Sequence, residues 1–464
     1  MVKNTKDAKA RLPLNVITNF MSLSLVTMIG LWVTPYLIKN FGVAVYGILP
    51  LLLSLLKYFN LLSGALTTAV GRFLTLSIQK NDYKSANEYY CSAICGVGLI
   101  GGLLLIVTVS ILPWLENIIT IPQGYETQTK GLLVLIVISV VLHVLGTVFN
   151  VGFFANHRFD LQNTVKIVAN ICRVLCIGFG LAYVSKTLYI VGGSYLLLSM
   201  ILLIGGYVFL KKMVPELKLK RSSFSSLALK QMTAMGGWTL LNSFGVLLYY
   251  NIDFIIINRV LGAEAGGLYA PIVQLTLLIA LIVATLNQIF APIIIQSVAE
   301  NNHAKMQQQT YRAIRYIGLV IILPIILICG FAKSVLVLWL GADFADLYKL
   351  LWLLMTPLVV LNSIRPLFAL INGLNAVKYL GIATLLGGVL NLGLSLVLVK
   401  FTSLGIYAVA LATILSLFIR NIIFLPLFSM KLIDGKVHKI YRQLISLLFA
   451  SLFLQNLHHV VWIL

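Results

Sequence analysis

Long apolar segments recur along the whole chain, and they constrain its fold more than any other feature. Each has at least about the 20 residues that a helix needs to cross the roughly 30 Å hydrocarbon core of a bilayer. We predict twelve membrane-spanning helices: Leu14–Ile38, Val43–Ala69, Cys91–Trp114, Gly131–Ala155, Thr164–Val184, Thr187–Leu210, Thr233–Asn258, Gly267–Val298, Ala313–Ala332, Leu350–Ile371, Tyr379–Val399 and Leu404–Phe428. A thirteenth apolar segment, Ile440–Leu464, is a span, an interfacial hairpin or the remnant of a longer fourteen-helix tail.

The composition agrees with an all-α polytopic membrane protein. Hydrophobic residues make up 60% of the chain, and the mean hydropathy is +1.00. Only 10% of the residues are charged, against about 25% in soluble domains. These values exclude a soluble enzyme, a disordered chain and a fibrous protein.

The basic residues predict the orientation of the chain. The formal net charge is +21, from 34 Lys and Arg against 13 Asp and Glu. The basic residues lie in loops between apolar segments, which is typical of a membrane protein rather than of a nucleic-acid-binding protein. In membrane proteins the cytoplasmic loops carry the excess of Lys and Arg. With a cytoplasmic N-terminus, only seven bases fall in outer loops: Lys39, Lys130, Lys186, Arg259, Lys333, Lys349 and Lys400.

The chain also contains an internal repeat. Leu37–Gly47, between the first two spans, matches Ile257–Gly267 at an offset of about 220 residues, so that Lys39 aligns with Arg259 and Gly42 with Gly262. The loop that begins Gln79-Lys-Asn-Asp aligns with Glu300-Asn-Asn-His. Because six spans separate the copies, both halves enter the membrane in the same sense, and we predict two parallel six-helix bundles. The expected domains are residues 1–210, a basic linker 211–232, residues 233–430 and an apolar segment 431–464.

Two short motifs resemble a known family. They are Asn251-Ile-Asp-Phe-Ile-Ile-Ile-Asn-Arg-Val-Leu-Gly262 with Gly267-Leu-Tyr269, and Trp32-Val-Thr-Pro-Tyr-Leu with Gly42 and Tyr46-Gly47. Both resemble Wzx-type polysaccharide flippases of the multidrug/oligosaccharidyl-lipid/polysaccharide superfamily. The resemblance implies two six-helix lobes related by a pseudo-two-fold axis around a central cavity, lined by helices one, two, seven and eight. It also implies the bacterial inner membrane as location and an undecaprenyl-pyrophosphate-linked oligosaccharide as substrate.

Ionisable residues inside spans are costly and are therefore candidates for function. Five lie well inside the predicted spans: Lys57, Arg173, Asp253, Arg365 and Arg420. Four of them are basic, and fixed cations offset the cost of moving a diphosphate through a low-dielectric region. A pump for cationic drugs would need acids instead.

The expected substrate-binding residues are Lys57, Arg173, Arg365, Thr68, Arg72, Asn19 and Gln288. Lys57 shares a helical face with Thr68 and Arg72, and Asn19 and Gln288 belong to uncharged polar stripes suited to sugars. Each of these residues also has a structural reading. Lys57 can pair with a carbonyl or with Asp253, Arg173 and Arg365 can tie helices together, and polar side chains join membrane helices.

Asp253, Arg259 and Lys39 are the expected coupling or gate residues. Asp253 is interpreted as a carrier of a coupling ion, H+ or Na+, or as the partner of a base. Arg259 and Lys39 stand at the outer mouth or extend to the interface, and Arg420 is expected to reach the inner surface in the same way. No catalytic residue, metal site or other cofactor is predicted.

Three functions are compatible with a chain of this kind. The first is a flippase for lipid-linked glycans, with membrane lipids and a polysaccharide polymerase or other assembly proteins as partners. The alternative is an ion-coupled multidrug antiporter. The third, a glycan polymerase or ligase, is disfavoured because every outer loop is short, and no loop contains the G-x-x-x-x-G-K-[ST] motif of a built-in ATPase.

Overall fold

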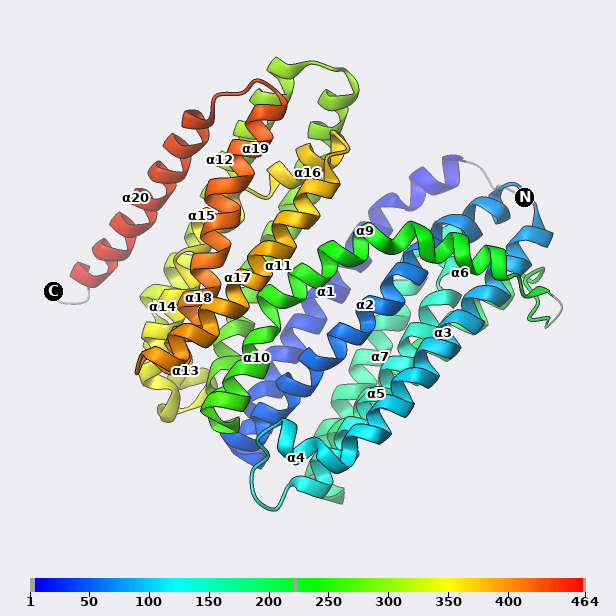
Figure 1. Cartoon of the computed structure of the whole chain (residues 1–464), viewed down its shortest axis with the longest axis horizontal. Helices are drawn as coiled ribbons and strands as arrows, with labels where there is room; N and C mark the ends of the chain where they lie inside the picture. The colour runs from blue at the N-terminus through cyan, green and yellow to red at the C-terminus, as the bar shows by residue number, and fades with distance from the viewer. Residues whose placement is uncertain (1–4, 221–222, 462–464) are drawn as a thin grey trace. The chain divides into compact units, whose positions relative to one another are not determined.

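A computed structural model shows the fold (Figure 1). It describes residues 5–220 and 223–461, with their side chains except those of 5–12, 58–69, 234–242, 250 and 452–461. The described residues form helices and no strands, which confirms the all-α prediction. The chain divides into two compact units, Met1–Leu240 (unit 1) and Leu241–Leu464 (unit 2).

Unit 1 is a bundle in which α5 and α7 both pack on α8, α1 packs on α7, and α2 packs on α3 and α5. Its buried core includes Leu74, Tyr90, Val148 and Leu210. The elements are α1 (Thr5–Phe41), α2 (Val43–Gln79), α3 (Tyr83–Ile111), η1 (Leu112–Trp114), α4 (Leu115–Ile118), α5 (Glu126–Phe149), α6 (Val151–Ala155), α7 (Phe159–Phe179), the π-helical η2 (Gly180–Val184) and α8 (Leu188–Met213).

Unit 2 is a second bundle. Helix α9 (Ser226–Tyr250) begins in unit 1 and ends in unit 2. Within unit 2, α11 packs on α12 and α16, and α17 packs on α18. The elements after α9 are α10 (Ile252–Ile256), η4 (Ile257–Leu261), α11 (Ala263–Ala299), α12 (His303–Gly330), α13 (Ala332–Leu340), η5 (Ala342–Leu347), α14 (Tyr348–Met355), α15 (Leu358–Ser363), α16 (Pro366–Gly373), α17 (Val377–Phe401), α18 (Ile406–Phe418), η6 (Ile419–Phe424), α19 (Leu425–Leu432) and α20 (Val437–Val461).

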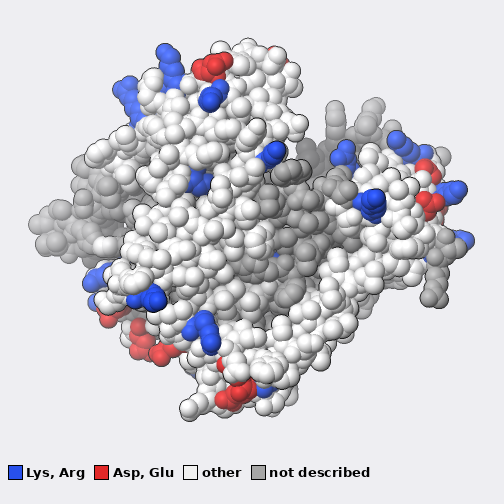
Figure 2. Space-filling model, viewed as in Figure 1, with Lys and Arg blue, Asp and Glu red and all other residues white. Residues whose placement is uncertain are grey.

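The described residues contain ten helical stretches long and apolar enough to cross a membrane, and an eleventh if a bent pair counts as one span. The ten coincide with ten of the twelve predicted spans. The bent pair, Ser243–Tyr249 and Ile252–Leu261, meets at 45° and corresponds to the seventh span. The second predicted span lies in α2, whose side chains are described only in part. On the face that Figure 2 shows, charged side chains gather mainly towards the helix ends.

The internal repeat is reproduced in the helix boundaries at an offset of 220 residues. Helices α2 and α11 both have 37 residues, and α3 and α12 begin at equivalent positions. Gly42 and Gly262 cap α2 and α11 with φ of 80° and 94° and ψ near 170°, a conformation that only glycine adopts without strain. The predicted pairing of the following loops is wrong by one residue, because Asn81 and Asn301 share the left-handed turn.

The same side-chain cap begins α3 and α12. Asp82 accepts a hydrogen bond from the Ser85 backbone N–H at 3.1 Å, and Asn302 accepts one from Lys305 N–H at 2.9 Å. Hydrogen bonds from Ser85 hold the pKa of the Asp82 carboxyl below its ordinary value. The two halves therefore use one device to start equivalent helices.

We expect Asn302→Ala to lower the stability of the protein by about 1 kcal/mol, because the mutant leaves the first N–H groups of α12 without their cap. The measurement is the midpoint of thermal unfolding in detergent, with exposed Gln308→Ala on the same helix as the matched control. An equal midpoint for the two variants would contradict a stabilising cap.

The segment after the twelfth span forms one continuous helix rather than a hairpin. Helix α20 packs on α12 and α15 of unit 2 and, at 25 residues, is about 37 Å long. The expected linker 211–232 lies in unit 1, held to α3 by hydrogen bonds of Asn87 with Glu216 C=O and Lys218 N–H. The segment 431–464 lies in unit 2, and the four-part division of the chain stays a prediction.

Candidate functional site: bases and a buried carboxylate inside the spans

The predicted polar residues of the first two helices are mostly exposed. Asn19 and Lys39 on α1 and Lys57 and Arg72 on α2 all present exposed side chains. Thr68 lies outside the described side chains. Their shared face therefore stays a prediction.

Arg173 lies near the middle of the fifth span, Phe159–Val184, as it does in the predicted span Thr164–Val184. Its guanidinium carbon is 5.0 Å from the centre of the Tyr195 ring on α8, a cation–π contact. Its Nε is buried and has no hydrogen-bond partner among the described residues.

Arg365 lies at a break in the tenth span. Helix α15 ends at Ser363 and α16 begins at Pro366, because proline lacks the N–H that would continue the preceding helix. The half-buried Arg365 stacks on Phe368 at 5.4 Å.

Arg420, which follows α18 in the π-helical turn η6, stacks on the same Phe368 ring at 5.2 Å and on Tyr249 at 5.3 Å. Its exposure is only 7%, so the expectation that Arg420 extends to the surface is wrong. The aromatic rings hold its guanidinium inside unit 2.

Neither Arg173 nor Arg365 takes part in an ion pair among the described residues. The ion pairs there are Lys130–Glu116, Arg158–Asp160, His303–Asp434 and Lys305–Glu300. The two guanidinium charges are therefore held by aromatic rings and not neutralised by carboxylates. Their N–H groups suit a phosphate, which arginine binds through paired hydrogen bonds.

Asp253 is buried in a polar cluster of unit 2 that also contains Tyr269, Asn391 and Thr413. Its exposure is 3%. The carboxylate accepts hydrogen bonds from Tyr269 Oη at 3.0 Å, Thr413 Oγ1 at 2.8 Å and Asn391 Nδ2 at 3.2 Å. None of the ion pairs among the described residues includes Asp253. Its partners are neutral donors, so its negative charge is solvated but not cancelled.

A helix break and a glycine pair build this cluster. Helix α9 ends at Tyr250 and α10 begins at Ile252, and Asn391 Nδ2 also lies 3.3 Å from the carbonyl oxygens of Leu248 and Tyr249. Glycines make the approach of α17 possible. A Cβ on Gly388 would lie 2.7 Å from Leu248 Cβ, and one on Gly387 would overlap the Tyr249 hydroxyl.

The cluster combines oxygens of the kind that bind a proton or an alkali cation. They are the Asp253 carboxylate, Asn391 Oδ1 and Thr413 Oγ1, which lies 3.2 Å from Asn391 Oδ1. In transporters, broken helices and their freed carbonyls commonly supply such ion sites. We did not predict Asn391, Thr413 or Tyr269. The available signal was the small and polar face of α17: Thr384, Gly387, Gly388, Asn391 and Ser395.

The remaining predicted residues stand apart from this cluster. Gln288 on α11 and Arg259 in η4 are exposed. Arg259 precedes Gly262 as Lys39 precedes Gly42, and both bases are exposed at equivalent positions of the repeat. Among the described residues, no group of three or more His, Cys, Asp or Glu could hold a metal ion.

Comparison with known proteins gives the same fold. The protein is similar to a multidrug resistance MATE family transporter of the MOP superfamily in an inward-facing conformation, with a TM-score of 0.72 and 15% identity over 91% of this chain and 98% of that one. It is also similar to a MOP superfamily transporter from Pyrococcus furiosus Vc1, with a TM-score of 0.60 and 15% identity over 92% and 96% of the two chains. The fold is thus that of MOP superfamily transporters, whose two lobes match the predicted pair of bundles.

Two sequence comparisons concern the family. The uncharacterized membrane protein EpsK of Bacillus subtilis (strain 168) is 28% identical over 440 residues, which cover 95% of this chain and 87% of EpsK. A family model described as "Polysaccharide biosynthesis protein" matches residues 42–349, which is more than half of the chain. The chain therefore belongs to this polysaccharide biosynthesis protein family of multi-pass membrane proteins with a transporter fold.

Proposed function

We propose that the protein flips a polyprenyl-diphosphate-linked oligosaccharide, a surface polysaccharide repeat unit, from the cytoplasmic to the outer leaflet of the bacterial inner membrane by alternating access. Its family membership and its MOP transporter fold support a flippase or transporter role. Membrane lipids and enzymes of polysaccharide assembly, such as a polymerase, are the partners that this role requires.

The observation that carries the proposal is the pair of half-buried arginines without carboxylate partners. Arg173 in unit 1 and Arg365 in unit 2 each lie inside an apolar span. A buried charge that no carboxylate compensates is costly. A diphosphate ligand supplies the missing negative charge, while the polyprenyl chain remains in the bilayer. Lys57 and Arg72, with Thr68, Asn19 and Gln288, add further cations and hydrogen-bonding groups for the phosphates and sugars.

The proposed orientation of the chain follows from the charge asymmetry of the loops. Only seven of the 34 bases lie in the predicted outer loops, so we place the N-terminus in the cytoplasm. The sugar-linked lipid would then enter from the cytoplasmic side, where most of the basic loop residues lie. These basic residues also favour contact with anionic lipids of the inner leaflet.

Asp253 is the proposed site of energy coupling, with Arg259 and Lys39 as gate residues at the outer mouth. A buried carboxylate with neutral donors changes its net charge when it takes up H+ or Na+. Binding and release of that cation would then favour different arrangements of the helices that supply Tyr269, Asn391 and Thr413. The ion is the only small cofactor in the proposal.

The experiment is transport by the purified full-length protein in sealed lipid vesicles. A fluorescent polyprenyl-diphosphate oligosaccharide is placed in both leaflets, and its exposure to an external quencher is followed with an imposed Na+ or proton gradient. We expect protein-dependent flipping that one of the gradients stimulates. Gradient-driven movement of a cationic dye without flipping of the glycan lipid would instead identify a multidrug antiporter, and an elongated glycan would identify a polymerase.

A further inference from the structure

A small polar pocket lies within unit 1, apart from the arginines and the carboxylate described above. Helices α5 and α7 both pack on α8 but pack little on each other. A Cβ on Gly205 of α8 would lie 2.6 Å from Val165 of α7, and one on Gly146 of α5 would lie 3.3 Å from Leu203 of α8. These close approaches fix α5 and α7 on α8 and leave a cavity of about 180 Å³ between them.

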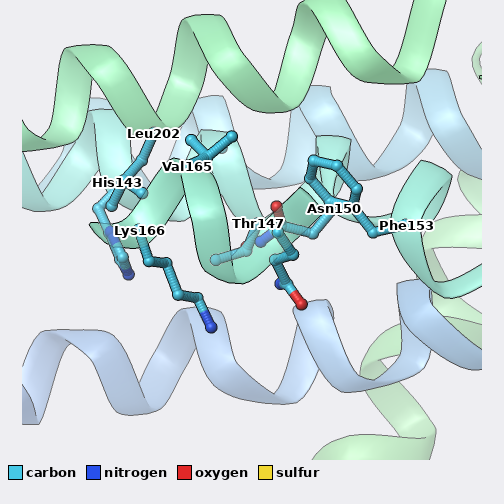
Figure 3. A pocket seen from close by; sticks show the side chains of 9 residues that line it. His143, Thr147, Asn150, Phe153, Val165, Lys166 and Leu202 are labelled. Carbon is cyan, nitrogen blue, oxygen red and sulfur yellow. The ribbon is translucent and has the colours of Figure 1, made fainter. Parts of the chain in front are cut away.

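The walls of the cavity are rich in hydrogen-bonding groups. His143 and Thr147 of α5, Asn150 after it, and Gln162 and Lys166 of α7 line it, together with apolar residues. Figure 3 shows the side chains of His143 and Lys166 next to each other and directed to the same side of their helices. The volume far exceeds the roughly 10–15 Å³ that one water needs, but it is too small for an oligosaccharide.

The two basic side chains of the cavity, Lys166 and His143, have no hydrogen-bond or ion-pair partner among the described residues. No acid lines the cavity. Asp160, the acid on α7, is already held by Arg158 through hydrogen bonds of 3.0 Å from Nε and from Nη2.

A half-buried ammonium without a counter-charge favours an anion in its cavity. Lysine binds phosphate as a point charge, and the imidazole and the two amides can complete the coordination of its oxygens, whereas the Thr147 hydroxyl already donates to the Val144 carbonyl at 2.6 Å. The cavity is therefore chemically matched to a phosphate group rather than to a sugar or a cation.

We propose that the cavity between α5, α7 and α8 is a phosphate-binding site centred on Lys166. Lys166 precedes Arg173 by seven residues, two turns of α7, so both bases lie on one side of that helix. If the proposed function holds, Lys166 is the first phosphate-binding position along α7 and Arg173 the second. The phosphate belongs to a soluble diphosphate, to the lipid-linked substrate or to an anionic phospholipid, and the shared chemistry is the phosphate oxyanion.

Binding by the purified full-length protein tests this site without a transport assay. In detergent, sodium pyrophosphate is titrated calorimetrically at constant ionic strength. In a second arm, phosphatidylglycerol and neutral phosphatidylcholine compete in nanodiscs, and retained lipid is identified by native mass spectrometry. We expect at least one phosphate probe to bind, and Lys166→Gln to weaken its binding at least about tenfold.

Three further variants make the result specific. Lys166→Arg keeps the charge and should retain most of the binding, whereas His143→Gln should weaken it less than Lys166→Gln. Exposed Lys333→Gln in unit 2 is the matched control and should bind like the wild type. Unfolding midpoints show that each variant is folded.

The arms separate the possible outcomes. Pyrophosphate binding that depends on Lys166 indicates a diphosphate ligand, and dependence seen only for phosphatidylglycerol indicates a lipid headgroup. Absence of binding in both arms, or binding that Lys166→Gln leaves unchanged, overturns the site. Because the proposed flipping is measured separately in vesicles, it can survive that result, and the site can likewise survive a failure of flipping.

Discussion

Replacing Arg173 with alanine is expected to slow flipping of the lipid-linked glycan by about 10- to 100-fold while the protein remains folded in the membrane. A hydrogen bond between charged groups contributes about 1.5–3 kcal/mol, and each 1.4 kcal/mol is a factor of ten. The Tyr195 ring would lose its cation–π partner, but no carboxylate would be left unpaired. The measurement is the rate of quenching in the vesicle assay.

The same argument applies to two other bases. Arg365→Ala removes the corresponding guanidinium of unit 2, and we also expect Lys57→Ala to abolish export while the protein stays inserted. Arg173→Lys should show an intermediate rate, because lysine keeps the charge but not the planar fork. Arg312→Ala, an exposed arginine of α12, is the control. Wild-type rates for all three alanine variants at matched protein levels would remove these bases from the mechanism.

Replacing Asp253 with asparagine is expected to remove the effect of the ion gradient on transport. The substitution keeps the size of the side chain but cancels the negative charge that the cation would neutralise. Flipping without a gradient should persist, and stimulation by the imposed Na+ or proton gradient should be lost. The ratio of the rates with and without the gradient measures the effect, and the ion whose gradient stimulates the wild type is the coupling ion.

Two further variants test whether the effect depends on the hydrogen bonds to Asp253 and on the location of the acid that is replaced. Tyr269→Phe removes one of the three hydrogen bonds to the carboxylate and should retain part of the stimulation. Glu300→Gln changes an exposed acid that pairs with Lys305 at 2.6 Å and should behave like the wild type. Full gradient stimulation in Asp253→Asn would show that the buried carboxylate has only a structural role.

Much of the architecture could be predicted because its signals are local along the chain. Ten of the twelve predicted spans appear as helices long and apolar enough to cross a membrane, since the free energy of placing a segment in hydrocarbon is roughly a sum over its own residues. The repeat could be found from Gly42 and Gly262, because their positive φ and extended ψ restrict both positions to glycine. The loop register was missed by one residue because Asn81 and Asn301 have few identical neighbours.

The surroundings of the candidate residues could not be predicted in the same way. Asp253 stood out as the only acid inside the spans, but its partners Asn391 and Thr413 lie 138 and 160 residues further along the chain. Arg420 was expected to reach the surface, and the Tyr249 and Phe368 rings hold it inside instead. Lys166 and His143 were not recognised as neighbours of one cavity.

Sequence patterns were enough to establish an all-helical membrane protein with an internal repeat, and to predict basic residues inside its spans. Hydropathy and charge can be summed over the residues of one segment, and a glycine acts at its own position, so these signals can be read along the chain. Which polar groups meet could be seen only in the three-dimensional arrangement, because that depends on how closely helices from distant segments approach. The glycines of α8 and α17 set those approaches, so they place Lys166 beside an open cavity and Asn391 against the Asp253 carboxylate.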